Sequence, residues 1–511
     1  MAWSALELAA SRLPTPLPVS RATVDGDGWL AVARHAAASG ARLVSVWGED
    51  RAGGPTVHAA YAAADGLLCV ALPLDAARRF PDLAGTFPCA TRMQRAVADL
   101  SGLRADGPQD GRPWLDHGLW AGQAPLAAGS QPAGAPLDTL PSDYAFVRVD
   151  GDGVHEIPVG PVHAGIIEPG HFRFSVVGEK VLRLEERLGY THKGIERRFT
   201  ELAPLDAHRL AGRVSGDSTV AFAWAYCMAL ESAAEVLIPE RAEWLRALML
   251  ERERVANHLG DLGALGNDAA LAFGLAQFSR LREDWQRRSR EAFGHRFMMD
   301  AIAPGGAAAD LSVPQRDAMR RQCDAVERDV RRLRQIYDEH AGLQDRFMTT
   351  GRVTPELAAR LGLAGLAGRA SGQAHDLRSD HGWPPYRRLH TKIATQNGGD
   401  VAARVAVRFD EVFESLRLIR ELCSGLPAGP AAAPVTAPSS EAGGIGWVEG
   451  WRGEVLVALH LGADGRIARC HCHDPSWQNW PVLEYAVIGN IVPDFPLINQ
   501  SFNLSYSGHD L

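Results

Sequence analysis

GPVHAGIIEPGHF, at residues 160–172, is the first of three segments that indicate most about the fold and the site of this chain. The other two are RLGYTHKGIE at residues 187–196 and RVSGDS at residues 213–218. They place glycine, histidine, arginine and carboxylate residues among apolar ones. Burying such a mixture costs free energy unless each polar group finds a partner. The pattern therefore indicates the lining of a site. The alternative is a set of tight turns whose charges are satisfied at the surface.

These segments resemble the large subunit of group 4 NiFe hydrogenases of the hydrogenase-3 and hydrogenase-4 type, which is homologous to the 49 kDa subunit of respiratory complex I. Three further segments are similar to that family: RASGQAHDLR at residues 369–378, EGWRGE at residues 449–454 and NIVPDFPLINQSF at residues 490–502. The resemblance covers residues 155–511 and implies an α+β fold. In that fold a large, mainly helical domain carries flanking β hairpins.

The metal ligands of that family are missing from this sequence. In the hydrogenases two C-x-x-C pairs bind nickel and iron, and the matching positions here are Ser215, Ser218, Ser505 and Gly508. Soft thiolates select soft metals, and a serine hydroxyl is a poor substitute. The sequence also ends at Leu511 without the family's metal-proximal histidine and processed tail. The expectation is that this chain binds no metal.

Complex I uses the same fold without the metal, and there a histidine and a tyrosine contact the quinone head group. The matching positions are Ile167 and Gly216, whose side chains cannot hydrogen-bond a quinone carbonyl. Other positions keep polar residues. The resemblance implies catalytic roles for Glu168, His192, Arg213 and Asp217, and cofactor-binding roles for His163, Tyr190, Lys193, Glu196, Arg369, Asp376 and Arg378.

Two of these residues have competing interpretations. Glu168 lies in a Gly/Pro loop among apolar residues, so burial would raise its pKa and suit it to proton transfer. It could instead form a buried ion pair with Arg173 or Arg213. His192 could carry protons or be a packed histidine. Asp376 and Arg378 are also expected in an ion-pair network around the cavity.

Composition limits the class of protein. The chain has 511 residues, more than one core usually holds, and a net charge of −8, which argues against general nucleic-acid binding. No apolar run approaches the ~20 residues needed to span a bilayer, and the N-terminus lacks a signal-peptide pattern. Seven scattered cysteines fit a reducing compartment. A cytoplasmic protein is expected, held at the inner face of the membrane through partner subunits.

Three regions are predicted. Residues 1–120 alternate helix and strand signals and resemble the 30 kDa subunit of complex I, a docking domain fused at this place in the family. Residues 121–142 are rich in Ala, Gly and Pro and are predicted to form a linker. Residues 143–511 form the large domain, with strands expected at 146–149 and 172–177 and with long helices at 219–237, 241–264, 275–293, 311–348 and 401–423.

The C-terminal part is expected to contain a flexible loop at 424–446, a hairpin of 455–461 with 467–473, and a short helix at 483–488. The hairpin carries the run CHCH at 470–473. Alternate residues of a strand face opposite ways, so the cysteines and histidines separate. Neither pair alone offers tetrahedral closure, and no zinc site is predicted.

Three functions remain open. The chain could be part of a membrane-associated, complex-I-like oxidoreductase and pass electrons from a partner's iron–sulfur cluster to a quinone-type acceptor. Antiporter-like membrane partners would then translocate ions. It could be a scaffold that kept the fold and lost the site. A NiFe hydrogenase is the third possibility, and the absent thiolates argue against it.

Overall fold

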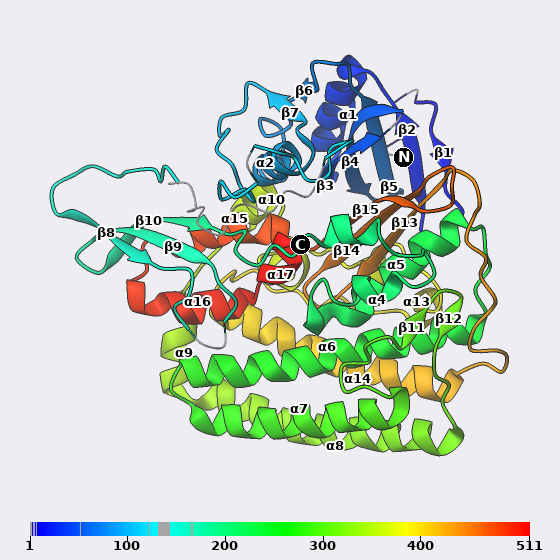
Figure 1. Ribbon diagram of the computed structural model, residues 1–511. Helices are drawn as coiled ribbons and strands as arrows, with labels where there is room; N and C mark the ends of the chain where they lie inside the picture. The colour runs from blue at the N-terminus through cyan, green and yellow to red at the C-terminus, as the bar shows by residue number, and fades with distance from the viewer. Residues whose placement is uncertain are drawn as a thin grey trace.

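A computed structural model describes Trp3, Leu6 and residues 8–51, 53–120, 122–130, 144–164 and 167–511. Its layers run from an N-terminal sheet, through a C-terminal sheet, to a bundle of long helices at the opposite end (Figure 1). The predicted α+β fold is confirmed. Most of the predicted linker, residues 121 and 131–142, lies outside the described residues, and residues 122–130 form turns.

The N-terminal part is a five-stranded sheet in the order β1-β2-β5-β4-β3, covered by two helices. Alternating apolar residues place one face of the sheet against α1 and α2. Its strands are β1 (Ser11–Arg12), β2 (Val19–Thr23), β3 (Arg42–Arg51), β4 (Gly54–Ala63) and β5 (Gly66–Pro73). The helices are α1 (Gly26–Ala38) and α2 (Ala90–Ser101), beside the short ribbon of β6 (Arg79–Pro81) and β7 (Arg104–Asp106).

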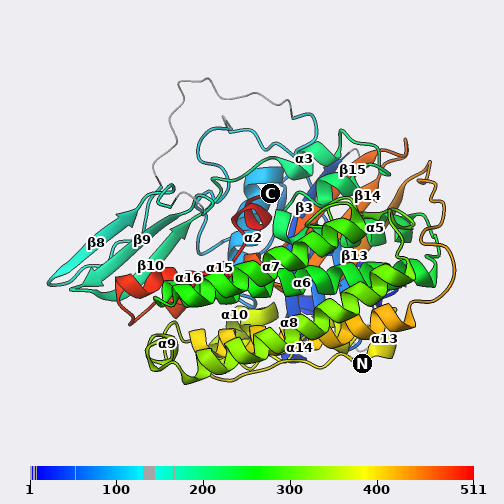
Figure 2. The same cartoon turned by 90° about the horizontal axis from the view of Figure 1, so that it is seen from below.

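A three-stranded sheet of order β10-β9-β8 projects from the side of the molecule (Figures 1 and 2). It consists of β8 (Val154–Val159), β9 (His171–Val177) and β10 (Lys180–Arg187). The strand predicted at 146–149 is wrong. Phe146 instead lies under the guanidinium of Arg173, 4.3 Å from its ring centroid. Since β8 reads VHEIPV and is largely exposed, its hydrophobic signal was too weak to identify it.

The bundle contains the four longest helices, which run side by side (Figure 2). They are α6 (Glu240–Asp268), α7 (Ala272–Phe293), α8 (Val313–Glu339) and α14 (Val401–Gly425). The single helix predicted at 311–348 is wrong, because His340 leaves the helical conformation and caps the separate helix α9 (Ala341–Phe347) with its side chain.

Helix α5 (Thr219–Ala233) is buried all round and packs on the C-terminal sheet of β13 (Ala442–Glu449), β14 (Glu454–Leu461) and β15 (Ile467–His473). Glycine permits this contact, because a Cβ at Gly446 would lie 1.8 Å from the carbonyl oxygen of Ala225. Strand β13 begins inside the loop predicted at 424–446, so the end of that prediction is wrong. The predicted hairpin of β14 and β15 is confirmed.

The alternation predicted for β15 is also confirmed. Cys470 and Cys472 face the apolar core. His471 faces the N-terminal sheet, where Trp47 stacks between His471 and His58 with both ring-centroid distances at 5.0 Å. The two regions therefore share a packed interface.

Short elements connect these layers. They are α3 (Ile195–Phe199), α4 (His208–Ala211), η1 (Gly216–Ser218), β11 (Ile302–Ala303), β12 (Gly306–Ala307), α10 (Pro355–Leu361), α11 (Gly365–Ala370), α12 (Leu377–Asp380), α13 (Tyr386–Leu389), α15 (Ser476–Ala486), η2 (Val492–Asp494), α16 (Phe495–Phe502) and α17 (Tyr506–Asp510). Among the described residues, none of the helices combines the length and apolarity of a membrane span.

Candidate functional site

A pocket of about 370 Å³ lies where Ile167 and Glu168, the turn at η1 and the segment from α16 to α17 meet. We call it the serine pocket. Its lining is mostly polar and comprises Ile167, Glu168, Ser215, Gly216, Asp217, Arg452, Asn499, Gln500, Asn503, Leu504, Ser505, Tyr506 and Ser507. Segments far apart in the sequence therefore build one pocket, to which the 160–172 and 213–218 motifs contribute residues and the 187–196 motif contributes none.

Of the four positions matched to the metal-binding cysteines, Ser215 and Ser505 line this pocket, and Ser218 and Gly508 lie next to residues that line it. The hydroxyl oxygens of Ser215 and Ser505 lie 2.8 Å apart, and Ser215 donates to Asp217 over 2.8 Å. The backbone N–H of Gly508 donates to Ser505 over 2.8 Å. Arg452 reaches the hydroxyl of Ser218 at 3.3 Å. The hydroxyls thus form a hydrogen-bonded chain that ends on a carboxylate.

This donor set does not fit a metal centre held by four thiolates. All seven cysteines are buried outside the lining of the pocket. At Gly508 a Cβ atom would lie 2.6 Å from an oxygen of Asp474 and 2.8 Å from the hydroxyl of Ser505. A side chain at position 508 therefore requires the surrounding residues to move.

Arg452 lines the serine pocket and binds two other residues of its lining. It binds Asp217 with two parallel hydrogen bonds of 2.7 Å and donates to the carbonyl of Asn503 over 2.6 Å. Burial raises the pKa of Asp217, but the guanidinium and the Ser215 hydroxyl outweigh burial, so that pKa lies below its usual range. Asp217 is therefore an ionised anchor. The sequence signal for Arg452 was its place in the EGWRGE segment.

Glu168 lines the pocket, but it is exposed, so the expectation of burial is wrong. Its carboxylate accepts the backbone N–H of Ser507 over 3.1 Å. Neither expected ion pair forms, since Arg173 binds Glu156 over 3.0 Å and Arg213 binds Asp300 over 2.6 Å. Ile167 and Gly216, the positions matched to the quinone contacts of complex I, also line the pocket.

Several predicted residues lie outside the pocket. Arg213 is half exposed in its pair with Asp300. His163 is exposed and binds the carbonyl of Gly160 through its ring over 2.9 Å. Tyr190 packs on His117 with a centroid distance of 4.5 Å.

Beside Tyr190, two further predicted residues bind backbone carbonyls. The ring of His192 contacts the carbonyl of Asp510 over 2.7 Å and packs against Trp120. The ammonium of Lys193 donates to the carbonyl of Val214 over 3.2 Å. His192 thus fixes this segment against the C-terminal residues, and Lys193 fixes it against the residues before η1.

Glu196 is buried in α3, and its carboxylate binds residues of β15. It binds Arg469 over 2.8 Å, His471 over 2.7 Å and the N–H of Cys472 over 3.2 Å. Burial opposes its ionisation, but these partners lower its pKa from 4.5 to about 2.

Because the folded pKa of Glu196 is lowered, its contribution to stability is complete above about pH 4.5 and is lost as pH falls toward 2. We expect the free energy of unfolding to lose about 3 kcal/mol over that range through this group, at about 1.4 kcal/mol per pKa unit. Urea unfolding at several pH values measures it. Glu196→Gln should reduce this loss of stability at low pH. Glu179→Gln, at an exposed site, should leave the pH dependence of stability unchanged.

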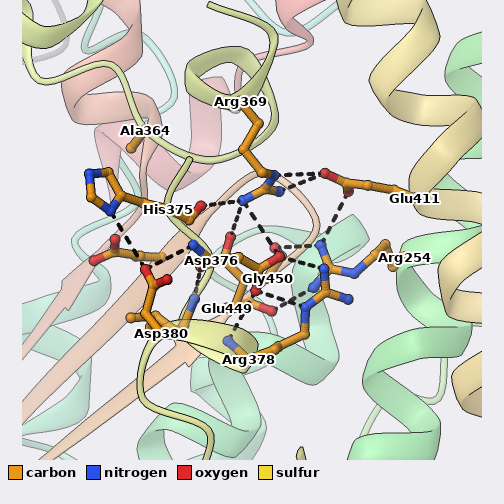
Figure 3. Close-up of polar contacts among 12 residues, drawn as sticks. Arg254, Ala364, Arg369, His375, Asp376, Arg378, Asp380, Glu411, Glu449 and Gly450 are labelled. Atoms are coloured by element: carbon orange, nitrogen blue, oxygen red, sulfur yellow. Dashed lines mark hydrogen bonds and ion pairs between the residues drawn. The ribbon is translucent and has the colours of Figure 1, made fainter. Parts of the chain in front are cut away.

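Arg369, Asp376 and Arg378 lie in what we call the buried charge cluster (Figure 3). Its members are almost completely buried and are Glu251, Arg254, Arg369, Asp376, Arg378, Glu411 and Glu449. Arg369 binds Glu411 and Glu449, each over 2.8 Å. Arg378 binds Asp376 over 2.6 Å and Glu251 over 3.0 Å. The predicted ion-pair network is present, inside the protein and outside the lining of the serine pocket.

Comparison with known proteins agrees with this architecture. Residues 268–443 match the family described as "Respiratory-chain NADH dehydrogenase, 49 Kd subunit", and residues 22–134 match "Respiratory-chain NADH dehydrogenase, 30 Kd subunit". Formate hydrogenlyase subunit 5 of Escherichia coli is 31% identical over 84% of this chain and 77% of its own length. The C/D component of the NADH-quinone oxidoreductase of Phocaeicola vulgatus is 26% identical over 75% of this chain and 78% of its own.

One solved structure has the same fold. It belongs to the membrane-bound sulfane sulfur reductase (MBS), an archaeal respiratory membrane complex, and superposes with a TM-score of 0.66. The match covers 70% of this chain and 99% of the other, at 23% sequence identity.

Proposed function

This chain belongs to the family of group 4 hydrogenase large subunits, the relatives of the complex I 49 kDa subunit with a fused 30 kDa-like domain, and we propose that its serine pocket reduces a quinone-type acceptor. Electrons would come from an iron–sulfur cluster of a small partner subunit. Antiporter-like partners would hold the chain at the inner face of the membrane and translocate ions. What supports the existence of partners is that the relatives are themselves subunits, of a formate hydrogenlyase and of an NADH-quinone oxidoreductase.

The serine pocket carries this proposal. Its volume of about 370 Å³ suits a single ring of small-molecule size. Asn499, Gln500 and Ser507 offer amide and hydroxyl donors for two carbonyl oxygens, while Ile167 and Leu504 add apolar surface. These donors would make the hydrogen bonds to a quinone that the side chains of Ile167 and Gly216 cannot make.

The reaction consumes two electrons and two protons for each quinone that becomes a quinol. Glu168 is exposed and lines the pocket, so it connects solvent with the bound ring. We assign it the transfer of protons to the ring oxygens. Asp217 stays ionised against Arg452 and fixes the pocket wall, so it takes no part as an acid.

The same pocket supports the proposal that the chain holds no nickel–iron centre. In place of four thiolates stand the hydroxyls of Ser215 and Ser505, which bind each other, the hydroxyl of Ser218, which Arg452 binds, and a glycine against Asp474. Hydroxyls of this kind stay protonated and bind soft metals weakly.

The test uses the complex purified with its partner subunits, assayed for reduction of a short-chain quinone and analysed for nickel. We expect quinone turnover without stoichiometric nickel. Glu168→Gln should lower the turnover about tenfold to a hundredfold, because general acid catalysis is lost while solvent still reaches the pocket. Glu179→Gln, outside the pocket, is the matched control. An intact complex without turnover would favour the scaffold function, and stoichiometric nickel with hydrogen uptake would favour a hydrogenase.

A further inference from the structure

Charge balance in the buried charge cluster leaves one negative charge without a partner. Three guanidinium groups, from Arg254, Arg369 and Arg378, face four carboxyl groups, from Glu251, Asp376, Glu411 and Glu449. Every one of these side chains is at most 2% exposed. An uncompensated charge at such a site is very costly, so the cluster is stable only when it also binds a proton.

The surroundings do not supply the missing positive charge. Asp261 is neutralised by Arg408 over 2.9 Å, and Glu454 pairs with Arg42. Asp380 lies at the edge of the cluster, 3.6 Å from His375. No further guanidinium or ammonium group of the described residues is paired with the four carboxylates.

His258 is a poor holder of the proton. Its Nε2 lies 2.8 Å from Glu411, so the neutral ring donates there. Its Nδ1 is buried and has no hydrogen-bond partner. A proton on Nδ1 would create an unsatisfied buried donor beside Arg254 and Arg408, and burial already lowers the pKa of this histidine.

Glu449 is the better holder. One of its oxygens contacts Arg369, and the other accepts only the N–H of Leu377 over 3.3 Å. Burial and the nearby Asp376 carboxylate raise the pKa of Glu449 to about 7, with Arg369 and Arg254 acting in the opposite direction. The other three carboxylates each have stronger partners.

The same segment connects Glu449 to the serine pocket. Arg254 holds the carbonyls of Glu449 and Gly450 over 2.8 and 3.0 Å (Figure 3). Two residues further on, Trp451 donates to the carbonyl of Asp217 over 3.0 Å, and Arg452 binds the carboxylate of Asp217. Charge at the pocket and charge at Glu449 therefore act on one short, rigid turn.

We infer that the buried charge cluster is a proton-binding site, with one exchangeable proton on Glu449, and that this proton responds to charge in the serine pocket. The response to the pocket rests on the proposed function, whereas the proton site rests on the cluster alone. The site would take up or release its proton as reduction changes the charge of the bound acceptor.

The first test is an infrared pH titration of the full-length chain in its complex, following the carbonyl band of protonated carboxyl groups. We expect a component of this band that titrates near pH 7 and that Glu449→Gln removes, while the contributions of other carboxyl groups with raised pKa values, such as Glu253 and Glu243, remain in that variant. The amide mimics the protonated acid, so this variant should fold. A wild-type spectrum without that component, or one unchanged by Glu449→Gln, would overturn the proton site.

Charge counting gives a sharper comparison. Asp376→Asn or Glu411→Gln leaves three carboxylates for three guanidinium groups, so the pKa of Glu449 should fall by at least about one unit, a tenfold change in proton affinity. Glu231→Gln removes a buried carboxylate from the separate pair with Arg246 and should not shift it. An unshifted pKa in both cluster variants, each still folded, would contradict the shared-charge account.

The second test adds a short-chain quinone and records the difference spectrum of the reduced complex. A change in the Glu449 band together with the quinone's own bands supports the link to the pocket. Quinone bands with an unchanged Glu449 band refute the link. Absence of quinone bands refutes the proposed function instead and leaves the titration to decide the proton site.

Discussion

Arg369→Met is expected to lower the free energy of unfolding by about 3–5 kcal/mol, the usual cost of removing one partner from a buried ion pair. Arg369 is completely buried and binds both Glu411 and Glu449 over 2.8 Å. Its loss leaves two guanidinium groups for four carboxylates. Urea unfolding followed by circular dichroism measures the effect, provided that one cooperative transition is seen.

Two variants make this prediction specific to buried charge. Arg369→Met combined with Glu411→Gln should recover part of the lost stability, because the ionised carboxylate that loses Arg369 as its partner becomes neutral. Arg320→Met, at a side chain 50% exposed in a surface pair, should change stability by no more than about 0.5 kcal/mol. If both arginine variants had similar effects, the cluster would not be the electrostatic core that its burial indicates.

The sequence predicted the long helices and the C-terminal hairpin well, because their signals are local. Apolar residues on all sides of α5 indicated a buried helix, and the CHCH run predicted its own alternation. The predictions were wrong where the sequence pattern was weak or mixed. Strand β8 carries few apolar residues, and the break at His340 lies within an otherwise continuous helical pattern.

The candidate site was only partly predictable. Matching the sequence to the family's motifs identified Asp217, and Ser215 and Ser505 where the family has cysteines, and all three line one pocket of the structure. Exposure of Glu168 could not be predicted from its apolar neighbours, because it depends on how the loop meets the segment around Ser507. The burial of Arg369 likewise depends on α14 and β13, which are distant in sequence.

Arg452→Met is expected to lower quinone turnover by roughly 10²- to 10³-fold, more than Glu168→Gln, because it disturbs the geometry of the whole pocket. Arg452 joins Asp217 to the carbonyl of Asn503, so it fixes two walls at once. Without it, Asp217 keeps a negative charge that the pocket no longer neutralises. A small displacement of the bound ring is enough to slow the reaction by this amount.

Adding Asp217→Asn to Arg452→Met separates charge from geometry. The double variant should regain stability, because no unpaired carboxylate remains, but turnover should stay low, because nothing rejoins the 449–454 turn to Asn503. Steady-state kinetics with a short-chain quinone, together with urea unfolding of both variants, measures the two effects. Turnover that recovered along with stability would mean that Arg452 acts only by neutralising Asp217, and its positioning role would be wrong.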